Sequence, residues 1–362
     1  MRLSTLPNQA PSTTSSCTVE RPWLSILIPV YNVEPYLLEC LNSVANQALD
    51  GVEIVVVDDA STDASSDLLT QWNQAHEGRL RVLTHPQNSG IGAARNSLIQ
   101  SARGEYIWFL DSDDIMLPGA IARLREILDQ RAVDMVLCDF KIVRPAMKLK
   151  HRLRGELHVK SFALKKGSVG EVQIQLTRGV FASGQVHLWT KIFRRQLIAE
   201  GFQFPVGRCF EDVAMMPELL SRARSYFYAP EVWIGYRKRP GSILAGSGLA
   251  KNDDMMQSLL GLPRRLPSDL DAETAFACAF FSAGFFLSAC RQAGKLGAHE
   301  RLPLYLAQFA QSIPLPIPSL LKAYRGRGWW WRAAKLQHWV KRCTAGSDQK
   351  QEDALFAIQG KD

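Results

Sequence analysis

The sequence predicts an α/β protein with a mixed, mainly parallel sheet flanked by helices and a mostly helical C-terminal region. Strand-like and helix-like segments alternate through the first 140 residues, as in repeated strand–helix units. Two of the strand-like segments are apolar along their whole length, which is typical of parallel strands covered on both faces. The 362 residues are 46% hydrophobic and 22% charged, and this ordinary composition excludes a disordered or collagen-like chain.

The front half supports this fold element by element. Residues 24–30 (LSILIPV) and 52–57 (VEIVVV) are predicted strands, and residues 36–48 between them carry apolar side chains at helical spacing. The remaining expected elements are helices at 63–76 (which Asp63 could cap), 91–102 and 118–130, and strands at 80–84, 105–110 and 133–138. Ligands of such sheets bind outside the carboxyl ends of the strands.

The rear half is less regular. Residues 141–182 are basic and predict a hairpin or a loop insertion. Further helices are expected near 196–200 and 213–222, a strand near 225–229, and mainly helices from 253, interrupted by a Pro-rich segment at 313–318. The uncharged, aromatic-rich stretch 274–290 is at the short limit for a membrane span, so we expect a buried helix and no transmembrane segment.

Charge is distributed unevenly. Residues 20–140 hold 18 acidic side chains against 8 arginines, residues 141–166 hold nine basic side chains against Glu156, and residues 301–347 hold eight basic side chains and no acid. This pattern argues against nucleic-acid binding along the whole chain and favours a front half that collects cations and a rear that faces something anionic. The seven cysteines are never spaced as CxxC, which favours buried thiols in a reducing compartment over disulfides or a zinc ribbon.

Carboxylates follow two of the predicted strands. Residues 58–63 read DDASTD and residues 111–114 read DSDD. Carboxylates gathered at one sheet edge repel one another unless a cation or donor groups satisfy them, and oxygen ligands without His or Cys indicate Mg²⁺ or Mn²⁺. Helix caps and turns explain Ser61 and Asp63 equally well, whereas Asp111 and Asp113 point more strongly to a metal-bridged diphosphate.

Two further motifs have competing explanations. Residues 88–96 (NSGIGAARN) offer backbone N–H groups and Arg95 to a phosphate or a base, and they imitate a dinucleotide fingerprint. That fingerprint belongs after the first strand, so a dinucleotide-dependent oxidoreductase is disfavoured. The pair Glu211–Asp212 is either a set of first-turn helix acids or a catalytic pair.

Seven segments in order over about residues 24–245 resemble family-2 glycosyltransferases of the GT-A fold, especially bacterial enzymes that build surface polysaccharides. They are LSILIPVYN, IVVVDDASTD, NSGIGAARN, YIWFLDSDD with its DxD motif, HLWTKIFRR, FEDVAMMPEL and YRKRPGSI. The resemblance implies a GT-A catalytic domain at 23–245, with a nucleotide-sugar half at about 23–140 and an acceptor half at about 141–245. A helical C-terminal region at 246–345 and flexible tails at 1–22, which lack the apolar core of a signal peptide, and at 346–362 complete the expected organisation.

The resemblance also implies roles for individual residues. Asp212 would be the catalytic base, and Asp113 would coordinate Mn²⁺ or Mg²⁺. The nucleotide sugar would contact Pro29, Tyr31, Asn32, Glu34, Asp59, Arg95, Asp111 and Ser112, and the acceptor or diphosphate side would involve Trp189, Lys191, Glu211, Arg239 and Ser242. Residues 207–209 (GRC) depart from the usual family pattern, which leaves the acceptor contacts open.

The implied reaction is inverting transfer of a sugar from a nucleotide-diphospho sugar, expected to be UDP-linked, to a hydroxyl of a glycan or lipid-linked acceptor. A catalytically inert nucleotide-sugar-binding protein of a polysaccharide assembly is the alternative. The Trp-rich basic segment 322–342 has the composition of an interfacial helix, although a packed helix with a solvated basic face explains it equally well. The expected location is cytoplasmic, peripheral on the inner face of the membrane through this anionic-lipid contact.

Overall fold

The computed structural model describes residues 21–47, 50–164, 169–170, 173–198, 201–239 and 248–345. Within these residues a nine-stranded sheet has the strand order β3-β2-β1-β4-β8-β6-β9-β5, with β7 paired to β9. The pairs β1–β2, β2–β3, β1–β4 and β6–β9 are parallel, and β8 is antiparallel to both of its neighbours. The predicted α/β fold with a mixed, mainly parallel sheet is therefore confirmed.

The strands are β1 (Leu24–Val30), β2 (Val52–Asp58), β3 (Leu80–Thr84), β4 (Tyr106–Phe109), β5 (Ile115–Met116), β6 (Met135–Val143), β7 (Val169–Gly170), β8 (Lys191–Arg194) and β9 (Tyr226–Arg237). The helices of the sheet region are α1 (Glu34–Ala45), α2 (Ser65–Ala75), α3 (Ile91–Ser101), α4 (Ala120–Gln130), α5 (Leu149–Leu153), α6 (Gln173–Ser183) and α7 (Glu211–Arg222). The C-terminal helices are α8 (Leu249–Ser258), α9 (Leu262–Arg265), α10 (Ala272–Lys295), α11 (Leu302–Gln311), α12 (Ile317–Gly326) and α13 (Trp330–Thr344). Short 3₁₀ turns η1, η2 and η4 occupy Leu188–Thr190, Arg195–Ile198 and His299–Arg301.

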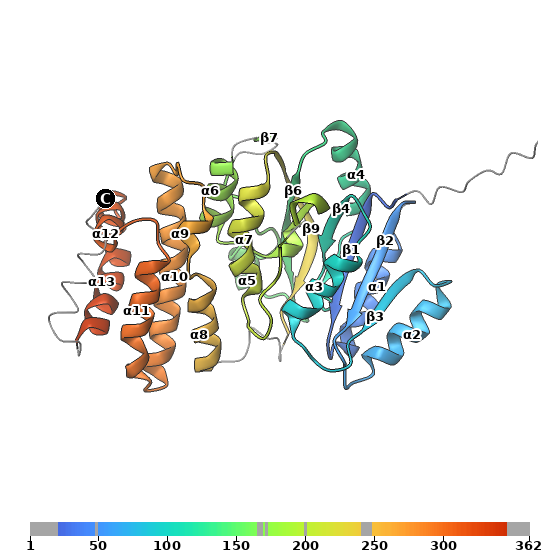
Figure 1. The fold of residues 1–362 in the computed structure, drawn as a ribbon, viewed down its shortest axis with the longest axis horizontal. Helices are drawn as coiled ribbons and strands as arrows, with labels where there is room; N and C mark the ends of the chain where they lie inside the picture. Colours follow the sequence, from blue (N-terminus) through green and yellow to red (C-terminus); the bar gives the residue numbers. More distant parts are fainter. Residues whose placement is uncertain are drawn as a thin grey trace, which may run out of the picture.

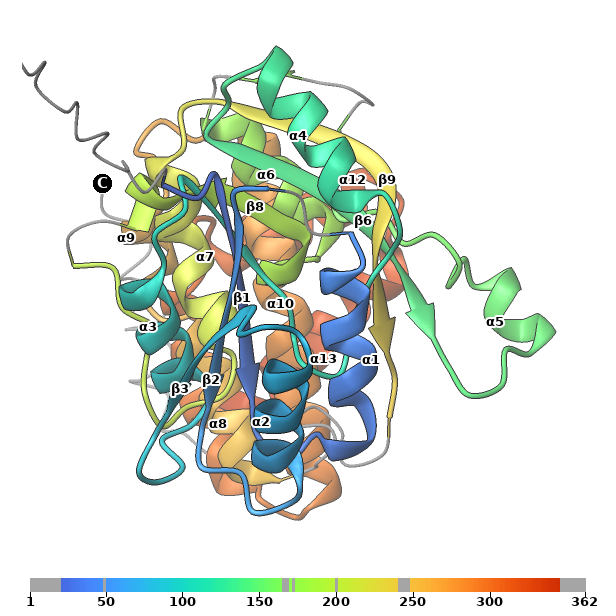
Figure 2. The ribbon, with the colours of Figure 1, turned by 90° about the vertical axis from the view of Figure 1, so that its right-hand side faces the viewer.

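Helices cover both faces of the sheet. Successive side chains of a strand point to opposite faces, so Ile26 and Ile28 of β1 belong to the core under α1, α2 and α4. Leu27 belongs to the opposite core, under α3, α6 and α7. Figure 2 shows α1 and α3 on the two sides of β1. Burial on both faces explains why the first strands are apolar along their whole length.

The C-terminal helices extend the molecule along its long axis. In Figure 1, α12 and α13 form the end farthest from β3 and α2, with α10 and α11 beside them. α10 is long and apolar enough to cross a membrane, but 67% of its apolar window is buried inside the protein. The expected buried helix at 274–290 is therefore present, and the break at 313–318 separates α11 from α12 as predicted.

The largest differences from expectation lie between residues 133 and 237. The strand expected at 133–138 continues to Val143, and the strand expected at 225–229 continues to Arg237. The helix expected near 196–200 is instead the 3₁₀ turn η2, and β8 was not predicted as a strand. The basic segment 141–182 contains a hairpin-like arm with α5, because Phe140 and Val159 pair in an antiparallel bridge.

Candidate active site

Three strands end side by side at the edge where the site is expected. β1 pairs Val30 with Asp58 of β2 and Leu27 with Phe109 of β4, so residues 58 and 112 lie on either side of residue 30 at the same level. Adjacent strands are about 4.8 Å apart, which places the acids after β2 and those after β4 about 10 Å from each other. The carboxyl ends of β2 and β4 therefore lie at one edge of the sheet.

The turn after β1 is rigid. Asn32 has a left-handed φ of 50°, and its side-chain oxygen accepts a hydrogen bond of 2.8 Å from the Thr62 backbone N–H. The backbone N–H of Glu34 donates to Asp63 at 3.0 Å, and a Glu34 oxygen accepts from the Ala64 N–H. The neighbouring Tyr31 side chain is 44% exposed and is free to contact a ligand.

Two of the residues predicted to contact the nucleotide are buried inside the protein. Pro29 is buried within β1, opposite Val57, so it does not line a pocket. Asp59 is 2% exposed and accepts hydrogen bonds from the backbone N–H groups of Ser89 and Gly90 and from His85. This carboxylate ties β2 to the loop before α3, and it does not present a free oxygen to a base.

Arg95 has a different place from the one predicted. Its guanidinium is buried and donates to Glu211 at the start of α7 and to Asp111 after β4, the second bond being 3.2 Å long. It also lies over the rings of Phe109 and Phe204, at 5.7 and 5.9 Å from their centres. Arg95 therefore joins three elements of the site by pairing carboxylates, instead of facing Asp59 or a phosphate.

The segment after β4 is held by two arginines of β9 and its extension. Arg239 Nε donates to a carboxylate oxygen of Asp113 at 2.6 Å. Arg237 donates its backbone N–H to Asp114 at 2.7 Å and its Nε to the Asp113 carbonyl at 2.9 Å. The second oxygen of Asp114 is buried without a partner, and burial together with Asp111 and Asp113 raises the pKa of Asp114 well above its ordinary value.

Asp111 and its neighbour Ser112 differ in access. The Asp111 side chain is 31% exposed, whereas Ser112 is 5% exposed. Burial raises the pKa of Asp111, Arg95 opposes the rise, and the charges of Asp113 and Asp212 add to it. Asp113 and Asp212 therefore both lie near enough to Asp111 for their charges to act on it.

The acidic pair opens α7 after a residue of unusual conformation. Phe210, just before the helix, has a left-handed φ of 63°, which turns the chain into the site. Burial raises the pKa of Glu211 to about 7, with Arg95 opposing the rise and Asp212 adding to it. Burial also acts on Asp212, but His187 and Arg95 outweigh it and hold the pKa of Asp212 below its ordinary value. Two adjacent acids with opposite pKa shifts are typical of sites that do acid–base chemistry.

His187 was not among the sequence-predicted site residues. Its Nδ1 lies 3.6 Å from an Asp212 carboxylate oxygen, and its ring stacks on Trp189 with the centres 4.9 Å apart. Tyr236 of β9 stacks on Trp189 at 5.4 Å, so three nearly parallel rings stand beside Asp212. The segment HLWTK was recognised as acceptor-side, but no sequence signal showed that its histidine meets an acid 25 residues later.

Trp189 and Lys191 support the loop that carries His187. Both are buried, so they do not contact an acceptor directly. Lys191 Nζ donates to the carbonyls of Gln185 and His187 and to the Thr190 hydroxyl, and burial lowers the pKa of Lys191 to about 7. These bonds fix the loop that carries His187. The remaining predicted residue, Ser242, lies outside the described residues.

The donor set suits a hard cation. Asp111 and Asp113 are partly exposed carboxylates, but the described residues contain no group of three or more His, Cys, Asp or Glu side chains arranged to hold a metal ion. Mg²⁺ and Mn²⁺ commonly bind through one or two carboxylates together with substrate phosphates, and such a mode fits these residues.

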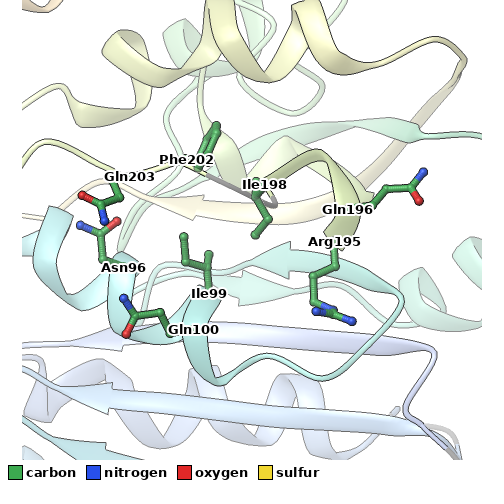
Figure 3. Close-up of a pocket in the computed structure, with 9 residues that line it drawn as sticks. Asn96, Ile99, Gln100, Arg195, Gln196, Ile198, Phe202 and Gln203 are labelled. Atoms are coloured by element: carbon green, nitrogen blue, oxygen red, sulfur yellow. The ribbon is translucent and has the colours of Figure 1, made fainter.

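A separate cavity of about 400 Å³ lies between α3 and residues 195–203 (Figure 3). Asn96, Gln100 and Arg195 are among its lining residues, and none of the acids described above lines it. Asn96 is fully engaged, because its amide donates to the carbonyl and accepts from the N–H of Phe204. This cavity is not part of the acidic site.

The strand order and the helices on both faces of the sheet define the class: an α/β domain of the GT-A fold. Its overall likeness to residues 1–349 of Staphylococcus aureus TarS, solved in complex with UDP-GlcNAc, has a TM-score of 0.66 at 22% identity and covers 91% of this chain and 92% of that one. The sequence model of the family "Glycosyl transferase family 2" matches residues 25–185, which include β1 to β6.

Two relatives support this assignment. The chain is 33% identical over 228 residues to EpsH of Bacillus subtilis (strain 168), named as a glycosyltransferase, and the match covers 61% of this chain and 60% of EpsH. It is 27% identical over 230 residues to TuaG of the same organism, named as a teichuronic acid biosynthesis glycosyltransferase, and that match covers 60% of this chain and 88% of TuaG.

Proposed function

We propose that the chain is an inverting glycosyltransferase that moves a sugar from a UDP-linked donor to a hydroxyl of a glycan or lipid-linked acceptor in surface polysaccharide synthesis. The observation that supports this proposal is that Arg95 bonds both Asp111 after β4 and Glu211 of the Glu211–Asp212 pair, in a chain that matches the family-2 model. The relative named for teichuronic acid synthesis and the UDP-GlcNAc complex of TarS support the polysaccharide and UDP parts of the proposal.

Asp212 is the proposed base. Its low pKa keeps the carboxylate ionised at neutral pH, and it is 17% exposed, whereas the Glu211 carboxylate is 7% exposed and bonded to Arg95. Asp212 takes the proton of the acceptor hydroxyl as that oxygen attacks the anomeric carbon. The nucleotide diphosphate leaves from the opposite face, so a single displacement inverts the anomeric centre and needs no covalent nucleophile on the protein.

The diphosphate side is assigned to residues after β4 and β9. Asp113, with Asp111 beside it, would hold Mn²⁺ or Mg²⁺, which neutralises negative charge on the departing diphosphate when bound. Arg239, whose Nε lies 2.6 Å from Asp113, is the proposed cation that contacts the diphosphate. Tyr31 is the exposed aromatic side chain at the donor edge and is the proposed contact of the base.

The transferase proposal is tested by donor binding and turnover. UDP-sugars with Mn²⁺ should raise the melting temperature, and EDTA or Asp113→Ala should remove that rise. Asp212→Asn should lower transfer by roughly 10²–10⁴-fold, the usual contribution of a general base, while donor binding and the melting temperature remain. Asp67→Asn, at an exposed site on α2, is the control with the same chemical change.

Two results would contradict the proposal. Full turnover by Asp212→Asn would remove this residue from the mechanism. Donor binding by the wild-type protein without nucleotide release, across a panel of glycan and lipid-linked acceptors, would indicate the inert nucleotide-sugar-binding alternative.

We also propose that the protein works at the inner, anionic face of the cell membrane, where a lipid-linked acceptor is presented. The basic segments and their exposed apolar side chains support this location.

A further inference from the structure

The two basic segments contain the clusters of exposed large apolar side chains. In the first, Leu149 and Leu153 of α5 are 72% and 80% exposed and Leu157 is 49% exposed. In the second, Trp330 and Trp331 at the start of α13 are 63% and 86% exposed. Apolar side chains left in water at this level, next to cations, indicate a surface that is covered in the working state.

The α5 arm is built to present its leucines. Residues 144–158 leave β6 and return to it, and Figure 2 shows α5 standing clear of the rest of the molecule. The base of the arm is closed by backbone hydrogen bonds between Phe140 and Val159 and by the ion pair of Arg144 with Glu156, 2.7 Å long. The arm is therefore a structured projection and not a loose loop.

The arm has two faces of different chemistry. Leu149 and Leu153 are four residues apart, which puts them on the same face of α5, while His151 between them is buried against the arm. The exposed cations of the arm are Lys148, Lys150, Arg152 and Arg154. Its one acid, Glu156, is already paired with Arg144, so the arm offers only positive charge together with its leucines.

α13 repeats the same combination. Ala333, Leu336, Val340 and Cys343 form its buried stripe against the other C-terminal helices. The opposite stripe consists of exposed side chains at helical spacing, namely Trp331, Lys335, His338 and Arg342. Beside it, an open groove of about 700 Å³ between α10 and α12 is lined by Lys322, Arg327 and Glu273 among others. α13 is thus a packed helix on one side and has an exposed basic, Trp-containing stripe on the other.

We propose that the α5 arm and the exposed face of α13 bind an anionic phospholipid bilayer. The leucines of α5 and Trp330 and Trp331 enter the interface between headgroups and acyl chains, and the surrounding cations contact lipid phosphates. The strength of such binding scales with the buried apolar area and with the attraction of cations to anionic lipid, and both patches supply apolar side chains together with cations. A second copy of the chain is a poor occupant, because apposing like patches would bring cations of one sign together. This inference rests on the proposed membrane location and can fail without the transferase proposal failing.

The test is sedimentation of the full chain with vesicles of two compositions. One consists of phosphatidylcholine alone, and in the other about one lipid in three is the anionic phosphatidylglycerol. We expect binding only to the anionic vesicles, weakened by salt. Leu149→Ser/Leu153→Ser and Trp330→Ser/Trp331→Ser should each weaken binding about tenfold or more, as burial of two large apolar side chains implies. Leu38→Ser/Val82→Ser, at apolar sites of 41% and 37% exposure outside both patches, is the matched control.

All these variants should keep the wild-type melting temperature and the rate of transfer to a soluble acceptor, so loss of binding is separable from loss of fold or activity. Equal binding to neutral and anionic vesicles, or no effect of either double substitution, would overturn the proposal. Binding to soluble polyphosphate as tight as that to vesicles and indifferent to the leucines would also overturn it and indicate a polymeric anion. A dimer that dissociates in Leu149→Ser/Leu153→Ser would indicate a second copy instead.

Discussion

Glu211 and Asp212 are consecutive acids with opposite proton affinities. Both are largely buried, and burial alone would raise both pKa values. The difference comes from their neighbours: Glu211 shares Arg95 with Asp111, whereas Asp212 has His187 at 3.6 Å. One guanidinium faces three carboxylates, so the excess negative charge favours a retained proton on Glu211 and an ionised Asp212.

His187 is a positioning residue whose removal should change the pH dependence of transfer. In His187→Ala the pKa of Asp212 should rise. Burial raises this pKa, and Arg95 would then oppose the rise without His187. The acid limb of the kcat profile should therefore move to higher pH, since His187 is one of the groups that lower the pKa of Asp212. The measurement is kcat from pH 4 to 9 for the wild type and the variant.

His187→Lys, which places a lysine cation at this position, should bring the limb back part of the way. His76→Ala, at a histidine stacked on Trp72 far from the acids, is the control. A rate that falls equally at every pH, without movement of the limb, would show that His187 acts only on local packing.

At the scale of elements, a close approach of α3 to the loop before α7 positions the acidic pair. A Cβ on Gly92 would stand 2.0 Å from the carbonyl oxygen of Pro205, so the backbone of one of the two segments would have to shift. The amide of Asn96, one turn further along α3, makes two hydrogen bonds to Phe204. α3 and the 204–210 loop are therefore fitted together at backbone distance.

Gly92→Ala should destabilise the protein by about 1–3 kcal/mol, as overpacking does, and should lower transfer by displacing Glu211 and Asp212. Gly284→Ala is the matched control: it is also a helical glycine, but nothing lies within 4 Å of its added Cβ. This control should be neutral or stabilise by roughly 0.5–1 kcal/mol. Urea unfolding and turnover measure both effects, and an unchanged Gly92→Ala protein would contradict the fitted contact.

Sequence patterns predicted the elements whose periodicity was uninterrupted. β1, β2 and β3 were located within a residue or two because their positions are set by apolar runs. β8 was missed because it is four residues long and includes the buried Lys191, which breaks the apolar pattern. Its lysine is tolerated there only because three oxygen acceptors of the same loop surround it, and no local pattern shows this.

The site was predicted better as a region than as individual contacts. The acids after β2 and β4 were expected at one edge, since parallel strands bring their carboxyl ends together. Which side chains pair across that edge was not predictable: Arg95 and Glu211 are 116 residues apart, and the partners of Asp59 come from a loop 26–31 residues further along the chain. Such pairings depend on the packed positions of helices and loops, which local spacing does not determine.

At the scale of the whole molecule, one hydrophobic core contains residues from both sides of the expected domain boundary near residue 245. One core combines Leu27 and Phe109 of the sheet with Leu259, Cys278 and Phe281 of the C-terminal helices. Phe281 stacks edge-on against Phe181 of α6 at 5.2 Å. Part of the helical region thus packs into the core of the sheet region, and the rest forms a second core around α10–α13.

Removing that region should therefore not leave a folded catalytic domain. Truncation after residue 239 would remove Leu259, Cys278 and Phe281 and expose the side chains of the sheet region that pack against them. Burying one large apolar side chain contributes about 1.5–3 kcal/mol to the free energy of unfolding. The lost total approaches the 5–15 kcal/mol that stabilises a typical domain, so the fragment should aggregate or lack a cooperative transition. The full chain should unfold in one calorimetric transition, because its two parts share this core. Two resolved transitions, or a soluble truncated fragment that still binds UDP with Mn²⁺, would show instead that the sheet domain is stable alone and that the helices are an added module.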